Sequence, residues 1–297
     1  MEKTHATPYA PLNGFAAAAR DRPELWRLPL TAALVFGLGF GGTILLYRAA
    51  ALVAPDFYFV FWSQPGSSPA GMVFLLAGFA VWLAAIFAAV ALVHRRGPPG
   101  LFGAPRQACR DGWRAGRAAA LLFVAVSLLL WPFEQEATRN VALPVWLLWL
   151  VPALLFLAVQ VTAEEVFFRG YLQQQLAARF RSPWLWMVAP SVLFGALHHD
   201  PSLGTMSYGL ILATGATGLA LADLTARSGT LGPAIALHFV NNVIALLLVS
   251  VQDDMAGLAL WTVDLDLSDP AVMVPLIALD LMTTLCLWLA ARLVLRV

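Results

Sequence analysis

Two adjacent carboxylates and an arginine, Glu164, Glu165 and Arg169, stand at the end of a long apolar run of the chain. A charged side chain deep in a bilayer costs at least ~2.5–3.5 kcal/mol, so such residues indicate a functional site and require partners. Two further polar clusters lie in apolar stretches of their own, at residues 194–199 and 238–242. Carboxylates and imidazoles are the usual general acids and bases, so the three clusters together could carry out proton-transfer chemistry.

Residues four apart lie on one face of an α-helix. Each cluster contains a pair at this spacing: Glu165 with Arg169, Phe194 with His198, and His238 with Asn242. We expect Arg169 to neutralise Glu165, whereas Glu164 points about 100° away around the helix and has no partner on that helix. A poorly solvated carboxylate without its own cation can act as general base or acid near neutral pH, so Glu164 is predicted to carry the chemistry.

The clusters can act together only if they lie at similar depths. At a rise of ~1.5 Å per residue, Glu164 lies about 14 Å and His238 ~12 Å from the inner ends of their helices. His198 would lie ~21 Å along a helix that begins at Ser182-Pro183, so that helix must protrude or tilt. If the three clusters meet, we expect them to enclose a polar cavity that is open to the cytoplasm.

The composition identifies the kind of protein that must position these residues. Hydrophobic residues make up 60% of the 297-residue chain, charged residues only 12%, and the mean hydropathy is +0.77. Soluble globular proteins have an apolar share nearer ~45–50%, so this chain is predicted to be an all-α polytopic membrane protein. Eight apolar stretches are candidates for crossing helices: 28–47, 72–93, 116–133, 144–163, 184–199, 205–223, 231–251 and 271–291.

The basic residues test this count, because cytoplasmic loops collect Lys and Arg. With the N-terminus inside, sixteen of the eighteen Lys and Arg residues fall on the inner side, and only Arg48 and Arg139 fall outside. This predicts an even number of crossings with both termini in the cytoplasm. The arginines are therefore read as topology determinants and not as a nucleic-acid surface, although the arginine-rich segment 94–117 could also touch anionic lipid.

The ordered motifs Glu-Glu-x-x-x-Arg, Phe-x-x-x-His and His-x-x-x-Asn on successive apolar helices resemble the CPBP family of intramembrane endopeptidases, also called the Abi or CAAX-protease family. The resemblance covers roughly residues 145–251. It implies an eight-helix membrane fold and proteolysis near the cytoplasmic face. The roles that it implies are as follows: Glu164 activates the attacking water, His198 holds that water, His238 and Asn242 stabilise the oxyanion, and Glu165, Arg169 and Phe194 support the site.

The resulting division of the chain has four parts: a cytoplasmic tail (1–27), N-terminal transmembrane helices (28–143), a CPBP/Abi-like catalytic core (144–251), and an outer loop with a last transmembrane helix (252–297). The expected substrate is a membrane-associated protein or peptide. The Ala- and Arg-rich, Lys-poor composition suits a bacterial plasma membrane. Whether the substrate is prenylated, and how many copies of the chain assemble, are not predicted.

Two alternatives stay open. Glu164, His198 and His238 could form a zinc site with one carboxylate, two imidazoles and an open position for water, or the enzyme could work without a metal cofactor. The same cluster could also serve a non-catalytic membrane partner or a proton-coupled transporter, as a ligand site or proton relay. The neighbouring His199 is expected to be a packed, hydrogen-bonded residue, and Asn241 is expected to form a hydrogen bond to a neighbouring helix.

Overall fold

The computed structural model describes residues 8–130, 137–252 and 255–297, and within this part the chain is largely helical. In chain order the elements are α1 (Ala10–Phe15), η1 (Ala17–Ala19), α2 (Arg27–Val53), α3 (Pro55–Ser63), α4 (Pro69–Ala77), α5 (Phe79–His94), α6 (Pro99–Phe102), α7 (Pro105–Leu130), β1 (Thr138–Arg139), α8 (Leu143–Glu165), η3 (Val166–Gln173), α9 (Gln174–Arg179), η4 (Trp184–Val188), α10 (Ala189–Ala196), η5 (Pro201–Met206), α11 (Ser207–Ser228), α12 (Gly232–Val243), η6 (Ile244–Leu248), β2 (Val249–Val251), η7 (Ala256–Leu258), β3 (Trp261–Val263) and α13 (Pro270–Leu295).

The predicted all-α membrane fold is confirmed. Among the described residues, five helical segments are long and apolar enough to cross a membrane: Arg27–Val53, Pro69–His94, Leu143–Arg179, Pro201–Ser228 and Pro270–Leu295. Two shorter apolar helices, Trp184–Ala196 and Gly232–Leu248, contain most of the second motif and the whole of the third. The predicted crossing 116–133 corresponds to α7, although residues 131–133 lie outside the described part of the chain. The count of eight crossings stays a prediction.

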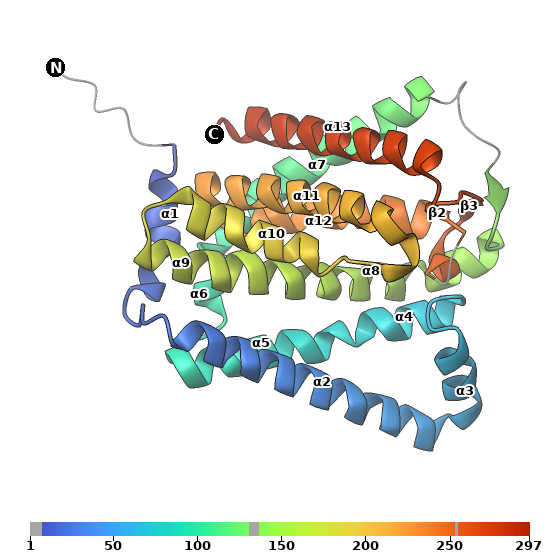
Figure 1. The fold of residues 1–297 in the computed structure, drawn as a ribbon, viewed down its shortest axis with the longest axis horizontal. Helices are drawn as coiled ribbons and strands as arrows, with labels where there is room; N and C mark the ends of the chain where they lie inside the picture. The colour runs from blue at the N-terminus through green and yellow to red at the C-terminus, as the bar shows by residue number, and fades with distance from the viewer. Residues whose placement is uncertain (1–7, 131–136, 253–254) are drawn as a thin grey trace.

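The helices stack in layers (Figure 1). Helices α2, α4 and α5 form one side of the molecule, α8 and α9 lie next to them, α10, α11 and α12 follow, and α7 and α13 complete the opposite side. The described start of the chain at α1 and the end of α13 lie at the same end of the bundle, which agrees with the predicted even number of crossings.

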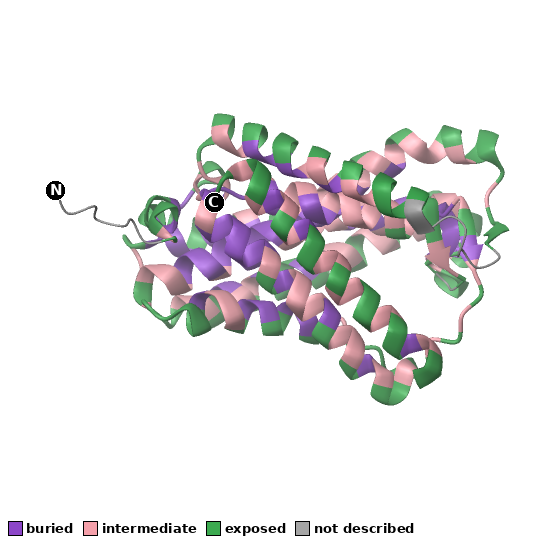
Figure 2. Ribbon diagram, turned by 90° about the horizontal axis from the view of Figure 1, so that it is seen from above, coloured by how far each residue is buried: buried purple, intermediate pink, exposed green. Residues whose placement is uncertain are grey.

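Burial follows the pattern of a membrane protein, with apolar side chains on the outside as well as the inside. Large apolar side chains such as Leu52 and Leu148 are 85% and 74% exposed, as they would be against lipid tails. Buried residues concentrate in the body of the bundle and toward the end that holds the C-terminus (Figure 2). Polar side chains are buried too, and they include Glu165, Arg169 and His238 of the predicted site, whereas Glu164, His198 and Asn242 are half-buried.

Two features were not predicted from the sequence. The first is a three-stranded sheet in the order β1-β3-β2, at the end of the bundle opposite α1 (Figure 1), with β1 antiparallel and β2 parallel to β3. The second is order in the segment expected to be a cytoplasmic tail: α1 buries Leu12 and Phe15, and the Tyr9 hydroxyl donates to Asp223 Oδ1 at 2.8 Å.

Close backbone approaches hold the motif helices together. A Cβ added at Gly195 would lie 2.5 Å from the Ile211 carbonyl oxygen, so only glycine lets α10 pack this tightly against α11. A Cβ at Gly218 would lie 3.1 Å from the Phe194 ring and 3.2 Å from Arg169 Nη2. These two glycines therefore place the second motif beside the first.

Candidate active site

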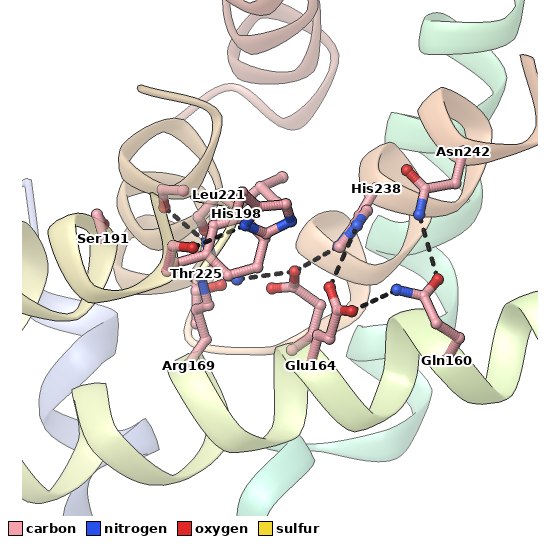
Figure 3. A network of polar contacts seen from close by, with 12 residues as sticks. Gln160, Glu164, Arg169, Ser191, His198, Leu221, Thr225, His238 and Asn242 are labelled. Atoms are coloured by element: carbon pink, nitrogen blue, oxygen red, sulfur yellow. Dashed lines mark hydrogen bonds and ion pairs between the residues drawn. The ribbon is translucent and has the colours of Figure 1, made fainter. Parts of the chain in front are cut away.

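The three polar clusters meet in the interior, as predicted (Figure 3). Glu164 and Glu165 are the last two residues of α8, which continues directly as the π-helical segment η3. Single π-helical turns inside α-helices are frequent at functional sites. Across the bundle, α12 presents His238, whose Nε2 lies 3.7 Å from Glu164 Oε2.

Glu165 forms the centre of a buried network. Its Oε1 accepts from Arg169 Nη1 at 2.9 Å, which is the predicted pair one helical turn apart. The same oxygen lies 2.8 Å from His238 Nδ1, a contact across the bundle that the sequence did not predict. Arg169 also donates from Nη2 to the Gly218 carbonyl at 3.0 Å. Because the side chains of Glu165 and Arg169 are 0% and 1% exposed, removing either partner would leave a buried, unpaired charge.

Glu165 also determines which ring nitrogen of His238 must carry a proton. A carboxylate only accepts hydrogen bonds, so His238 Nδ1 must carry a proton. Nε2, on the side of Glu164, is then a lone pair in neutral imidazole and a second N–H donor in imidazolium. Glu165 is therefore placed to orient His238 as well as to pair with Arg169.

Gln160 is a member of the site that the sequence analysis missed. Its Nε2 donates to Glu164 Oε1 at 2.5 Å, and its Oε1 accepts from Asn242 Nδ2 at 3.2 Å (Figure 3). The prediction that Glu164 has no partner on its own helix was therefore wrong, because Gln160 lies one turn before it. The signal was present: Gln160 is a lone carboxamide in the apolar stretch 143–161, at the same four-residue spacing used for the other pairs.

His198 follows the last turn of α10, and its backbone N–H donates to the Gly195 carbonyl at 2.9 Å. Its Nδ1 lies 2.8 Å from the Phe194 carbonyl oxygen and must donate a proton to it. In the neutral ring Nε2 is then an acceptor, suited to receive a hydrogen bond from a water molecule. The Phe194 ring lies between the two imidazoles, with centroid distances of 4.9 Å to His198 and 6.1 Å to His238.

A pocket of about 390 Å³ reaches Glu164 and His198. The other residues that line it are apolar or aromatic and come from α2, α5, α8, η3 and α10: Val35, Phe36, Phe79, Trp82, Ile86, Ala163, Phe167, Phe168, Phe194 and Leu197. The sequence predicted a polar cavity open to the cytoplasm, whereas this pocket is mostly apolar, with Glu164 and His198 as the polar groups of its wall. Glu164 of the first motif and His198 of the second nonetheless line the same pocket. The greater depth expected for His198 along its helix therefore does not keep the two side chains apart.

Residues 144–244 match the family described as "Type II CAAX prenyl endopeptidase Rce1-like". We call residues 144–244 the Rce1-like segment after this similarity. It contains all three motifs, so the predicted resemblance to the CPBP family is confirmed for this part of the chain. A curated relative is the "Uncharacterized protein YyaK" of Bacillus subtilis (strain 168), 26% identical over 144 residues. That alignment covers 46% of this chain and 47% of the relative, so the chain spans about half the length of the protein it matches. No solved structure matches the chain.

Glu164, His198 and His238 are the residues considered above as zinc ligands. Among the residues that the structure describes, no group of three or more His, Cys, Asp or Glu side chains is arranged to hold a metal ion. Glu164 and His238 approach each other to 3.7 Å, whereas no hydrogen bond or ion pair joins His198 to either of them within this part of the chain. The three side chains are therefore not gathered into a metal site in this arrangement, and the choice between a zinc-dependent and a metal-free reaction stays a prediction.

His199 and Asn241, the sequence neighbours of two motif residues, were predicted to lie outside the reaction. His199, next to His198 in sequence, is exposed and does not line the pocket of the Rce1-like segment. Asn242 reaches the site through Gln160, whereas the side chain of its neighbour Asn241 forms no hydrogen bond within the described part of the chain. His199 and Asn241 thus lack the side-chain hydrogen bonds expected of them among the described residues, and the His199 ring contacts the Tyr208 ring, at a centroid distance of 6.3 Å.

Proposed function

We propose that this protein is an intramembrane endopeptidase that hydrolyses a peptide bond of a membrane-associated protein or peptide, with Glu164 as general base. The observation that carries the proposal is the joint position of Glu164 and His198 on one pocket. Glu164 is hydrogen-bonded by a neutral amide and lies 3.7 Å from His238 Nε2, whereas its neighbour Glu165 forms the close pair with the buried arginine. One carboxylate is thus engaged in structure and the other is available for proton transfer.

The proposed reaction begins with a water molecule beside Glu164. His198 Nε2 accepts one hydrogen bond from this water, and Glu164 removes its other proton as the oxygen attacks the carbonyl carbon. The carbon–oxygen π electrons move onto the carbonyl oxygen. Glu164 then delivers its proton to the amide nitrogen as the carbon–nitrogen bond breaks, which leaves a new carboxyl terminus and a free amine.

The oxyanion needs N–H donors that are already in place. We assign this role to His238 Nε2 and to the second N–H of Asn242, whose first N–H is held by Gln160. The role requires His238 to carry protons on both ring nitrogens. Glu165 supplies the fixed acceptor for the Nδ1 proton, at 2.8 Å.

The apolar pocket beside Glu164 is proposed to hold an apolar group of the substrate. Its aromatic walls, which include Phe36, Phe79 and Trp82, suit a large hydrocarbon side chain or a lipid group. The protein itself is proposed to act in a bacterial plasma membrane with both termini in the cytoplasm. Cleavage rates of peptides that carry an isoprenyl group, compared with those of the same peptides without it, distinguish a lipid group from a hydrocarbon side chain as the occupant.

The decisive test compares membrane peptidomes of cells that carry wild-type protein or Glu164→Gln. We expect cleavage products that depend on Glu164 while both proteins accumulate equally. In reconstituted vesicles, heavy-oxygen water should place its oxygen in the new carboxyl terminus. His198→Gln and His199→Gln form a matched pair, of which only the first should slow turnover. If the Glu164→Gln protein is folded and the cleavage products are the same as in the wild type, the proposal is refuted. If the peptides are unchanged but proton flux across the membrane is lost, a proton-coupled transporter is favoured instead.

A further inference from the structure

Helix α7 carries a stripe of exposed residues whose character changes abruptly along the helix. Arg110, Arg114 and Arg117 follow one another at spacings of four and three residues, so they share one face. The same face continues with Leu121, Val124 and Leu128, which are 64%, 57% and 72% exposed. The change from arginine to aliphatic residues is the pattern of a helix that passes from a headgroup region into hydrocarbon.

A second helix brings another arginine to this boundary. Helices α7 and α13 pack against each other through Ala115, Ala119 and Ala291. Beside this contact lies a cleft of about 500 Å³, and its lining residues are Arg114, Arg117, Ala118, Leu121, Leu293, Val294 and Arg296. The cleft therefore combines three guanidinium groups with exposed aliphatic side chains.

The arginines of this cleft have no ion-pair partner in the part of the chain that the structure describes. Arg110 pairs with Asp111, and Arg227 pairs with Asp223, so these neighbouring arginines are satisfied. Within residues 8–130, 137–252 and 255–297, no carboxylate forms an ion pair with Arg114, Arg117 or Arg296. Three converging like charges repel one another, and a bound phosphate would relieve that repulsion through the bidentate contacts that arginine favours.

We propose that the cleft between α7 and the end of α13 binds one anionic glycerophospholipid. Its phosphate lies among Arg114, Arg117 and Arg296, and an acyl chain follows the surface of Leu121 and Leu293. Basic pockets between transmembrane helices are known to hold anionic headgroups. The aliphatic half of the cleft selects a lipid over a free phosphate ion. Arginines that only set topology would not need to converge from two helices on one cleft.

The test uses the full chain in detergent and native mass spectrometry with dioleoylphosphatidylglycerol or dioleoylphosphatidylcholine. We expect the wild type to retain the anionic lipid at least about fivefold better, and this preference to weaken as salt is raised. Arg117→Gln/Arg296→Gln should abolish the preference. The matched control is Arg106→Gln/Arg179→Gln, which removes two other exposed arginines outside the cleft and should keep the preference.

Each other outcome overturns the proposal. If both double variants lose the preference equally, the protein responds only to total charge. If Arg117→Gln/Arg296→Gln keeps the preference, the lipid binds elsewhere. If inorganic phosphate at the same concentration displaces the lipid, the cleft is a site for a free anion. Thermal unfolding of all variants in neutral detergent shows that they are folded, since all four arginines are exposed.

Discussion

Replacing Gln160 by leucine isolates the contact that joins Glu164 to the third motif. Gln160 is 7% exposed and does not line the pocket, so the change should leave substrate binding and KM unaltered. It removes the donor that lies 2.5 Å from Glu164 Oε1 and the acceptor that lies 3.2 Å from Asn242 Nδ2. A hydrogen bond to a charged group contributes about 1.5–3 kcal/mol. If that energy orients Glu164 in the transition state, kcat falls about ten- to a hundredfold.

The assay is steady-state turnover of an identified peptide in reconstituted vesicles, with thermal unfolding measured in parallel. Gln173→Leu is the matched control: Gln173 lies on the same continuous helix and is fully buried, but it donates to the Ala222 carbonyl away from the site. This variant should lose about 0.5–1.5 kcal/mol of stability with kcat unchanged. Equal losses of kcat in Gln160→Leu and Gln173→Leu, or a Gln160→Leu variant within twofold of wild type, would refute the positioning role.

Three other changes test separate parts of the site. Glu165→Gln leaves Arg169 buried without its carboxylate and should cost about 3–5 kcal/mol in the free energy of unfolding, measured by denaturant titration; a stable variant would contradict the network around His238. Trp82→Ala enlarges the pocket and should lower KM for substrates with bulkier apolar groups without changing kcat; unaltered selectivity would place the substrate elsewhere. Chelator treatment of purified protein should leave activity intact, whereas loss followed by recovery with zinc would assign a metal role.

The sequence predicted those features that depend on local spacing. Apolar runs of sufficient length located the helices, because a bilayer requires them. The pair of Glu165 and Arg169 followed from the four-residue repeat, since both residues lie on one helix. The same rule applies to Gln160, which lies four residues before Glu164 on the same helix and contacts it.

Contacts between helices could not be predicted in the same way. The bond from Glu165 Oε1 to His238 Nδ1 joins residues 73 positions apart, and no spacing rule says which of two adjacent carboxylates faces α12. The small sheet likewise joins Thr138 to Thr262 through short segments without a strand pattern. Such contacts depend on how helices rotate and approach, which here is governed by glycines such as Gly195.

The proposed function divides chemistry and selectivity along the chain. Every residue assigned to the reaction lies within the Rce1-like segment 144–244, from Gln160 to Asn242. The pocket walls Phe36, Phe79 and Trp82 lie on α2 and α5, outside that segment. Under the proposed function, Phe36, Phe79 and Trp82 contact the substrate whereas the motif residues contact the reacting bond. Changes in α2 and α5 should then alter which substrate is bound, while changes in the catalytic motif residues should alter the rate. The wall residues of the Rce1-like segment itself, such as Phe167 and Phe194, are shared between the two functions.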